Sequence, residues 1–177
     1  MNFVLCGMMG SGKTTVGKSL AKLLACEQLD TDDVISAQHG KISNIFSQYG
    51  EEYFRTLERG LAQELSGRDK LVISTGGGFV LNEKNATLLK KNGKIIFLRA
   101  RLETLELRLS ADENRPLLHS SNEPLKEKLS RLIVERYPIY ESVADCVVDV
   151  EAKSAEEIAK EIILRVEKQE KGQAGTR

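Results

Sequence analysis

Hydrophobic residues along the chain gather in short continuous runs that are bounded by turn residues. Four clear runs lie at residues 3–6, 71–74, 95–98 and 146–150, and a weaker one ends at Leu29. Runs that are apolar at every position are typical of strands buried on both faces of a sheet. The pattern therefore predicts a set of short, fully buried strands.

Between these runs, apolar residues recur at the three- and four-residue spacing of amphipathic helices. The segments with this spacing are 16–24, 45–65, 88–89, 102–109, 129–133 and 158–166. Strands that alternate with helices form a parallel sheet, because each helix returns the chain to the end of the sheet at which the previous strand began. We therefore expect an α/β protein of three layers, with helices on both faces of the sheet.

Two segments interrupt the alternation. One is a long helical stretch over about 43–66, and the other is the polar sequence ADENRPLLHSSNEP at 111–124, which has no apolar period. Polar loops of this length are usually functional or disordered. The charged, glycine-containing tail at 169–177 is expected to be flexible.

The composition narrows the class of protein. A chain of 177 residues, 41% hydrophobic and 29% charged, fits one globular domain, which we place at 1–168. Its 26 basic and 26 acidic side chains cancel, so no overall field favours nucleic acid or an anionic membrane as partner. Three scattered cysteines predict buried free thiols, and the lack of a signal sequence or membrane span predicts a cytoplasmic protein.

The strongest chemical signal is GMMGSGKT, Gly7 to Thr14, which fits G-x-x-x-x-G-K-[ST] and stands between an apolar run and an amphipathic helix. Glycines let successive backbone N–H groups surround phosphate oxygens at the positive end of the new helix. Lys13 is expected to reach the β- and γ-phosphates, and the Thr14 hydroxyl to bind Mg²⁺. The flanking elements make an accidental glycine-rich turn a poor alternative. The expected ATP-binding residues of this loop are Gly10, Ser11, Gly12, Lys13, Thr14 and Thr15.

A second glycine run, TGGG at Thr75 to Gly78, follows the apolar run at 71–74. It is expected at the carboxyl edge of the sheet, where ligands of α/β proteins bind. Consecutive glycines there would let a substrate touch bare backbone, although a flexible turn has the same composition. The chain has no N-K-x-D motif, which disfavours a GTP-dependent switch.

Three carboxylates lie in LDTDDV, at the end of the weak run. Asp30 would point toward Thr14, within reach of Mg²⁺ through a water. Asp32 could accept a hydrogen bond from an acceptor hydroxyl. Asp33 could cap a helix that begins at Val34, which is the ordinary role of such a residue.

Three arginines have ordinary explanations when each is taken alone. Arg55 stands at the i, i+3 position from Glu58, where an exposed ion pair would contribute less than ~1 kcal/mol. Arg136 precedes Pro138, a helix breaker, so it could interact with a helix C-terminus. Arg115 could be a loop charge.

Taken in order, however, the motifs resemble those of the shikimate kinase family, over about residues 2–166. They are the phosphate-binding loop, D-x-D at 30–32, F-R-x-x-E at 54–58, T-G-G-G at 75–78, R-P-L-L at 115–118 and E-R-x-P-x-Y at 135–140. The resemblance implies a P-loop kinase fold with a five-stranded parallel sheet in the order 2-3-1-4-5. It also implies a helical substrate-binding insertion at about 31–62 and a mobile lid at about 110–124. The implied reaction transfers the γ-phosphoryl group of ATP to the 3-hydroxyl of shikimate, on the route to chorismate and the aromatic amino acids.

The resemblance also implies roles for individual residues on the acceptor side. Asp32 would bind and orient the accepting hydroxyl, and Asp30 would act through the Mg²⁺ shell. Arg55 and Arg136 would bind the shikimate carboxylate, for which the planar guanidinium is well shaped. The backbone around Gly77 would contact the substrate, supported by Phe54 and Glu58; the glycines involved are Gly76, Gly77 and Gly78.

On the nucleotide side, the implied ligands are Arg108, which would stack on adenine, and Arg115, which would move in with the lid to stabilise charge on the phosphoryl group. Lys153 would contribute to ATP binding. Its loop differs from the corresponding loop of the family, in which many members have a proline at the position of Ala155 and some have an arginine at the position of Lys153. With Lys13 and Asp32, Arg115 completes the expected catalytic set.

Two other readings remain open. The first is another small-metabolite kinase, such as a gluconate kinase, whose acceptor also carries hydroxyls and a carboxylate. The second is a non-catalytic nucleotide-binding module, which would need neither Asp32 nor Arg115. We expect a monomer whose partners are small molecules.

Overall fold

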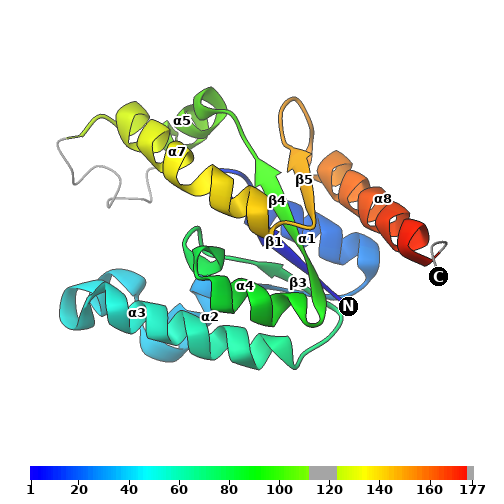
Figure 1. Ribbon diagram of the computed structural model, residues 1–177. Helices are drawn as coiled ribbons and strands as arrows, with labels where there is room; N and C mark the ends of the chain where they lie inside the picture. The colour runs from blue at the N-terminus through cyan, green and yellow to red at the C-terminus, as the bar shows by residue number, and fades with distance from the viewer. Residues whose placement is uncertain (112–122, 175–177) are drawn as a thin grey trace.

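The computed structural model describes residues 1–111 and 123–174 of the chain (Figure 1). One sheet of five parallel strands forms its centre, in the order β2-β3-β1-β4-β5. The strands are β1 (Asn2–Cys6), β2 (Glu27–Asp30), β3 (Leu71–Ser74), β4 (Gly93–Arg99) and β5 (Cys146–Asp149). The expected sheet and strand order are confirmed.

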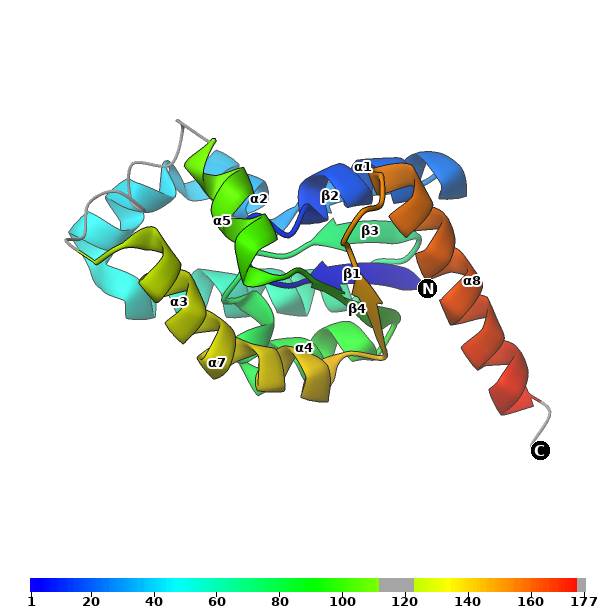
Figure 2. The same ribbon diagram turned by 90° about the horizontal axis from the view of Figure 1, so that it is seen from above.

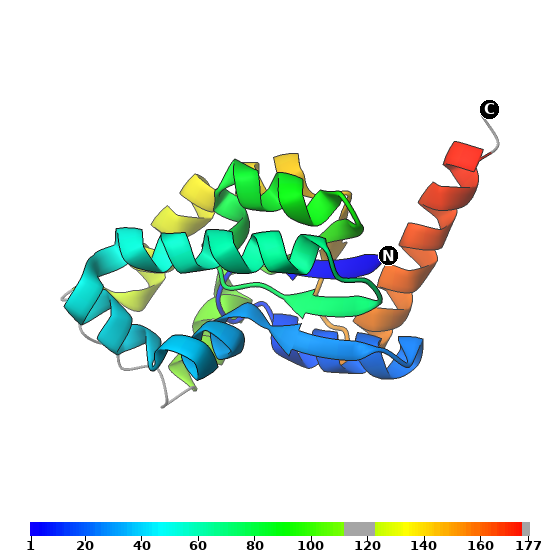
Figure 3. The same cartoon turned by 90° about the horizontal axis from the view of Figure 1, so that it is seen from below.

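Helices cover both faces of the sheet, as Figures 2 and 3 show. Helices α1 and α8 pack together on one face, and α3, α4 and α7 lie on the other. The helices are α1 (Lys13–Leu24), α2 (Thr31–His39), α3 (Ile42–Ser66), α4 (Glu83–Lys90), α5 (Leu102–Ser110), α7 (Leu125–Val143) and α8 (Ala155–Ala174), with a short 3-10 turn η1 (Phe79–Leu81). None of these helices has the length and apolar character that a membrane span needs.

The core is built around the three inner strands, most of whose side chains are buried. The segment 95–98 of β4 has no solvent exposure at any position, which explains why its sequence does not alternate between apolar and polar residues. All three cysteines are free, but only Cys6 and Cys146 are buried, and Cys26 is half-buried. This core leaves the carboxyl ends of the strands facing the space between α2 and α3 on one side and α5 and α7 on the other (Figure 1).

Helix α2 begins earlier than the sequence indicated. It starts at Thr31, and its N-cap is Asp30, whose extended backbone (φ −111°, ψ 127°) lets the carboxylate accept a hydrogen bond from the Asp32 N–H at 3.0 Å. The expectation that Asp33 caps a helix starting at Val34 is therefore wrong. Asp33 is exposed in the first turn, where a negative charge interacts favourably with the helix dipole.

Three other expectations about helices need adjustment. Pro138 does not end its helix, because α7 continues through it to Val143. Helix α3 covers the expected stretch but is interrupted at Gly50, whose φ of 81° favours glycine. The tail at 169–177 is helical as far as Ala174, and its flexibility stays a prediction.

Candidate active site

A cavity of about 490 Å³ opens at the carboxyl ends of the strands. It is lined by the phosphate-binding loop, the β2–α2 junction, α3, the glycine run, α5 and α7. The predicted site residues that line it are Gly10, Gly12, Lys13, Thr14, Thr15, Asp30, Asp32, Arg55, Gly76, Gly77, Gly78, Arg108 and Arg136. An adjoining cavity of about 270 Å³ shares Gly12, Thr15 and Arg108 with it and adds Ser11 and Lys153. Arg115, and most of the predicted lid, lie outside the described residues.

The phosphate-binding loop connects the end of β1 to the start of α1. Gly10 and Gly12 have φ values of 79° and 94°, which side chains other than glycine rarely adopt. The first turn of α1 contains no acidic residue of its own, so the helix does not cap its positive end with a side-chain carboxylate. The buried Ser11 hydroxyl oxygen has no hydrogen-bond partner among the described residues. Such an arrangement suits an anion, because backbone N–H groups and the dipole both favour negative charge.

Lys13 reaches back over the start of this loop. Its ammonium donates hydrogen bonds to the carbonyl oxygens of Gly7, at 3.0 Å, and Met8, at 2.9 Å. These bonds hold the lysine side chain along the cavity wall rather than extended into solvent. The charge therefore stands beside the loop in which phosphates would bind.

Thr14 and Asp30 bring two oxygen ligands together. The Thr14 hydroxyl donates to Asp30 Oδ2 at 2.8 Å, while Asp30 Oδ1 accepts from the Asp32 N–H. Because the hydroxyl proton is directed at Asp30, the lone pairs of Thr14 are left for a cation. Within the described residues no cluster of three or more His, Cys, Asp or Glu could hold a metal. Mg²⁺ needs none, since it is commonly held by one or two oxygen side chains, waters and the phosphates of the substrate, so these residues fit it.

Each glycine of the 76–78 run faces one predicted acceptor-binding side chain. A methyl group on Gly76 would collide with Asp32 Oδ1, and one on Gly78 would collide with the Arg55 guanidinium. A methyl group on Gly77 would lie 3.4 Å from Arg136 Nη1. The three side chains come from α2, α3 and α7, so the glycine run is where these helices meet in the cavity.

The glycine run is itself held firmly in place. The Gly76 N–H donates to the Thr31 hydroxyl at 2.8 Å, and the Thr75 hydroxyl donates to the Leu5 carbonyl at 3.0 Å. Thr31 and Thr75 are both buried. The run is thus a fixed floor of the cavity, and the alternative of a flexible turn does not fit these contacts.

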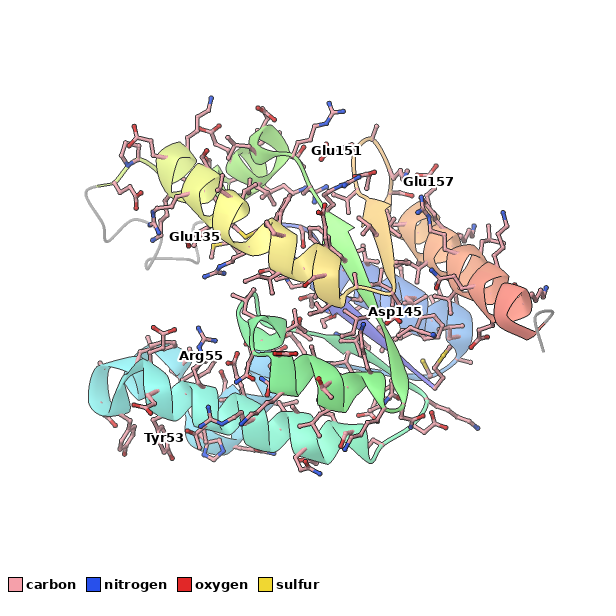
Figure 4. All side chains as sticks on the ribbon, viewed as in Figure 1. Tyr53, Arg55, Glu135, Asp145, Glu151 and Glu157 are labelled. Atoms are coloured by element: carbon pink, nitrogen blue, oxygen red, sulfur yellow. The ribbon has the colours of Figure 1, made fainter. Side chains whose placement is uncertain are left out.

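Arg55 is oriented by two carboxylates on its own helix. Its guanidinium contacts Glu58 at 2.8 Å and Glu51 at 2.7 Å. The i, i+3 pair with Glu58 is therefore confirmed, but the expectation that it is exposed is wrong. Glu58 is 1% exposed, and this burial raises its pKa even though Arg55 acts in the opposite direction. In Figure 4, Arg55 points to the side of α3 that faces α7, and Tyr53 points away from it. The pair is therefore part of the cavity wall, where Phe54 also lies.

The side of the cavity predicted to bind the nucleotide is bounded by α5 and the loop between β5 and α8. Arg108 donates to the Gly10 carbonyl at 3.1 Å, so α5 touches the phosphate-binding loop directly. Lys153 is held by Glu161 at 2.7 Å and by the Asp149 carbonyl at 2.9 Å. Arg108 and Lys153 line the same smaller cavity, as the prediction of an adenine site requires.

Glu151 joins these two walls. Its carboxylate accepts hydrogen bonds from the Arg101 N–H at 2.7 Å and the Thr104 hydroxyl at 2.6 Å, both at the start of α5. Figure 4 shows it between α5 and the β5–α8 loop. Helix α5 has no cap from its own side chains, so Glu151 supplies the acceptor from another segment.

Several residues of the site have no clear functional signal in the sequence. Thr31 lies between Asp30 and Asp32 in the sequence, and its position inside the D-x-D motif was the only indication of a role. Ile42 and Phe46 line the cavity, because the break at Gly50 turns the first part of α3 toward Phe54. The ring centroids of Phe46 and Phe54 lie 4.9 Å apart. Only the apolar spacing of α3 indicated that Ile42 and Phe46 are partly buried. This spacing does not distinguish a residue of the cavity wall from a residue of the hydrophobic core.

Comparison with known proteins gives one consistent result. The family model described as shikimate kinase matches residues 9–167. Shikimate kinases from Caldanaerobacter subterraneus subsp. tengcongensis and Thermodesulfovibrio yellowstonii are 44% and 42% identical to the chain. These alignments cover 92% and 97% of this chain, and 94% and 98% of the relatives.

The fold agrees with the sequence comparison. A solved structure of shikimate kinase from Acinetobacter baumannii in complex with shikimate superimposes with a TM-score of 0.87 and 38% identity. That match covers 95% of this chain and 93% of the other. With the phosphate-binding loop, the glycine run and their converging side chains in place, the chain belongs to the shikimate kinase family, a family of kinases.

Proposed function

We propose that the cavity transfers the γ-phosphoryl group of ATP to the 3-hydroxyl of shikimate, giving shikimate 3-phosphate and ADP. The observation that carries the proposal is the convergence of Asp32, Arg136 and Arg55 on three consecutive glycines beside a phosphate-binding loop. Membership of the family supports the same acceptor, and it disfavours a gluconate kinase or a non-catalytic module.

On the acceptor side, the arrangement suits a hydroxy acid. Arg55 and Arg136 would bind its carboxylate with charge-assisted hydrogen bonds, which are stronger than neutral ones. Asp32 would accept a hydrogen bond from the reacting hydroxyl, orient it, and take up its proton as the bond to phosphorus forms. Because Gly76–Gly78 carry no side chains, the substrate would approach the backbone between these groups.

On the nucleotide side, residues 10–15 would hold the phosphates through backbone N–H groups and the Thr15 hydroxyl. Lys13 would move its ammonium from the loop carbonyls to the β- and γ-phosphate oxygens. Arg108 and Lys153 would bound the adenine. Arg115 would act on the phosphoryl group, a role that stays a prediction.

We propose that the Thr14 hydroxyl, and Asp30 through a water, would hold Mg²⁺ together with the phosphates of ATP. When bound, it neutralises charge on the transferred group. Asp30 would keep the Thr14 lone pairs directed at the metal through the 2.8 Å hydrogen bond.

We also propose that the protein is a cytoplasmic monomer, and that its partners are ATP and shikimate and not nucleic acid.

The test is a coupled assay of ADP release by the purified protein. With ATP and Mg²⁺, we expect rapid ADP release only when shikimate is added, and none above background with gluconate. Removal of Mg²⁺ by a chelator should abolish it. Equal ADP release without shikimate, or turnover of gluconate alone, would contradict the proposal.

A further inference from the structure

Helix α7 carries two tyrosines that pack on the same aromatic ring, Tyr140 fully buried and Tyr137 half-buried. Tyr137 and Tyr140 both contact the ring of Phe97, with centroid distances of 5.0 and 5.1 Å. Both hydroxyls donate to a backbone carbonyl, Tyr137 to Ala100 and Tyr140 to Gly77 at 2.5 Å. They differ in where that carbonyl lies, because Ala100 follows β4 whereas Gly77 is the middle of the glycine run.

Tyr140 also stands next to Arg136, one turn earlier on the same helix. A methyl group placed on Gly77 would lie 3.4 Å from Arg136 Nη1 and 3.9 Å from the Tyr140 hydroxyl. The hydroxyl, the guanidinium and the Gly77 backbone are therefore mutual neighbours at one wall of the cavity. Tyr140 itself has no solvent exposure, so its ring is held by the core while its hydroxyl reaches the site.

We propose that Tyr140 is a positioning residue for the acceptor, whose hydroxyl fixes the Gly77 backbone and the Arg136 guanidinium relative to each other. Its single proton is given to the Gly77 carbonyl, so its oxygen presents lone pairs to the neighbouring arginine. Arg136 thereby keeps one rotamer while its remaining donors face the cavity. The inference rests on the proposed role of Arg136 as a ligand of the substrate carboxylate.

The Tyr140 hydroxyl keeps its proton, and so can donate a hydrogen bond, at neutral and mildly alkaline pH. Burial raises the pKa of Tyr140 to about 12, although the nearby Arg136 charge and side-chain hydrogen bond act in the opposite direction. The group therefore remains a donor at neutral and mildly alkaline pH. Tyr137 has its pKa raised to about 12 by burial as well, which makes the two tyrosines matched in ionisation.

The matched pair allows a direct test with Tyr140→Phe and Tyr137→Phe. Each variant loses one hydroxyl and one hydrogen bond to a carbonyl and keeps its ring. We expect Tyr140→Phe to raise the shikimate KM roughly 5- to 50-fold, as for the loss of a hydrogen bond that orients a charged group, and to leave the ATP KM unchanged. Tyr137→Phe should lower the melting temperature without changing either KM.

A purely structural role would give a different result. If Tyr140→Phe lowered only the melting temperature, like Tyr137→Phe, and left shikimate saturation unchanged, the inference would be wrong. An equal rise in both KM values would also contradict it, since that would report a general disturbance of the site.

A second comparison tests the link to Arg136. In an Arg136→Lys background, adding Tyr140→Phe should raise the shikimate KM much less than it does in the wild type, because the shared arrangement is already lost. Equal increases in both backgrounds would show that the two residues act independently. A wild-type enzyme that did not use shikimate would contradict the proposed function and this inference together, whereas normal wild-type turnover with an unaffected Tyr140→Phe contradicts the inference alone.

Discussion

The two halves of the cavity are built in opposite ways. We propose that one half binds the nucleotide and the other half binds the acceptor. The nucleotide half depends mostly on one continuous segment, residues 7–15, whose backbone would form the binding surface. The acceptor half takes one side chain each from α2, α3 and α7, and these meet at the three glycines of 76–78. One half is therefore a local structure, and the other exists only when distant segments are packed together.

This difference has consequences for substitution. Backbone N–H groups in a loop are retained when a neighbouring side chain is changed, so the nucleotide half should tolerate many replacements outside Lys13, Thr14 and the glycines with positive φ. Each acceptor residue, in contrast, acts through its side chain, which a substitution removes. Changes there should affect shikimate and ATP very differently, and the following predictions separate the two halves.

The largest effect is expected for Asp32→Asn. An amide cannot take up the proton of the accepting hydroxyl, so kcat should fall roughly 100- to 10,000-fold, as for loss of a general base. Binding of ATP, measured by calorimetry, should stay within a factor of about two, because Asp32 lies on the acceptor side. A loss of ATP affinity as large as the fall in kcat would contradict the division of the cavity into a nucleotide half and an acceptor half.

Arg136→Ala should be next in size. Removing a charge-assisted contact to the substrate carboxylate is expected to raise the shikimate KM by a factor on the order of 10 to 1000, with ATP saturation preserved. Steady-state kinetics with each substrate varied in turn would measure this. An unchanged shikimate KM would show that Arg136 does not bind the carboxylate.

Gly76→Ala tests the close approach of the glycine run to Asp32. The added methyl group collides with the Asp32 carboxylate, and overpacking of this kind costs about 1–3 kcal/mol. We expect kcat/KM for shikimate to fall roughly 5- to 150-fold. Gly60→Ala is the control, because nothing lies within 4 Å of a methyl group at that position of α3. It should leave the kinetics unchanged and stabilise the helix slightly.

Glu151→Ala should produce a smaller effect confined to the nucleotide half. Loss of a helix cap typically costs about 1 kcal/mol, so the ATP KM is expected to rise roughly two- to fivefold as α5 and Arg108 become less well placed. Glu157→Ala is the matched control, since Glu157 accepts from the Ser154 N–H at the start of its own helix, α8, at 2.7 Å. A rise in the shikimate KM for Glu151→Ala would contradict the assignment.

The smallest effect concerns the pH dependence of stability. Burial raises the pKa of Glu58 above its ordinary value of 4.5, so the folded state binds this proton more tightly than the unfolded state. As pH rises from 4.5 through the raised pKa, the wild type should lose stability relative to Glu58→Gln, and below pH 4.5 the difference should be constant. Urea unfolding of both proteins between pH 4 and 7 would measure it, and parallel profiles would contradict the shift.

Much of the fold was predictable because its signals are local. Continuous apolar runs marked the buried strands, and three- and four-residue spacing marked the helices between them. The errors fell at boundaries. Asp30 rather than Asp33 caps α2, because the choice among three neighbouring carboxylates depends on which one has an extended backbone and can accept a hydrogen bond from the N–H two residues ahead. Pro138 remains inside α7, where packing of the helix outweighs the loss of one hydrogen bond.

By itself, the sequence determined the phosphate-binding loop and the buried strands, since each of these depends on residues that are close together along the chain. Short motifs also identified the side chains available for an acceptor, but not how they meet. The tertiary structure decided which glycine faces Asp32, Arg136 or Arg55, that Thr31 holds the floor of the cavity, and that Tyr140 rather than Tyr137 reaches it. Those relations depend on how α2, α3 and α7 pack against the carboxyl edge of the sheet. Packing of this kind is set by contacts between residues tens of positions apart, which no local pattern specifies.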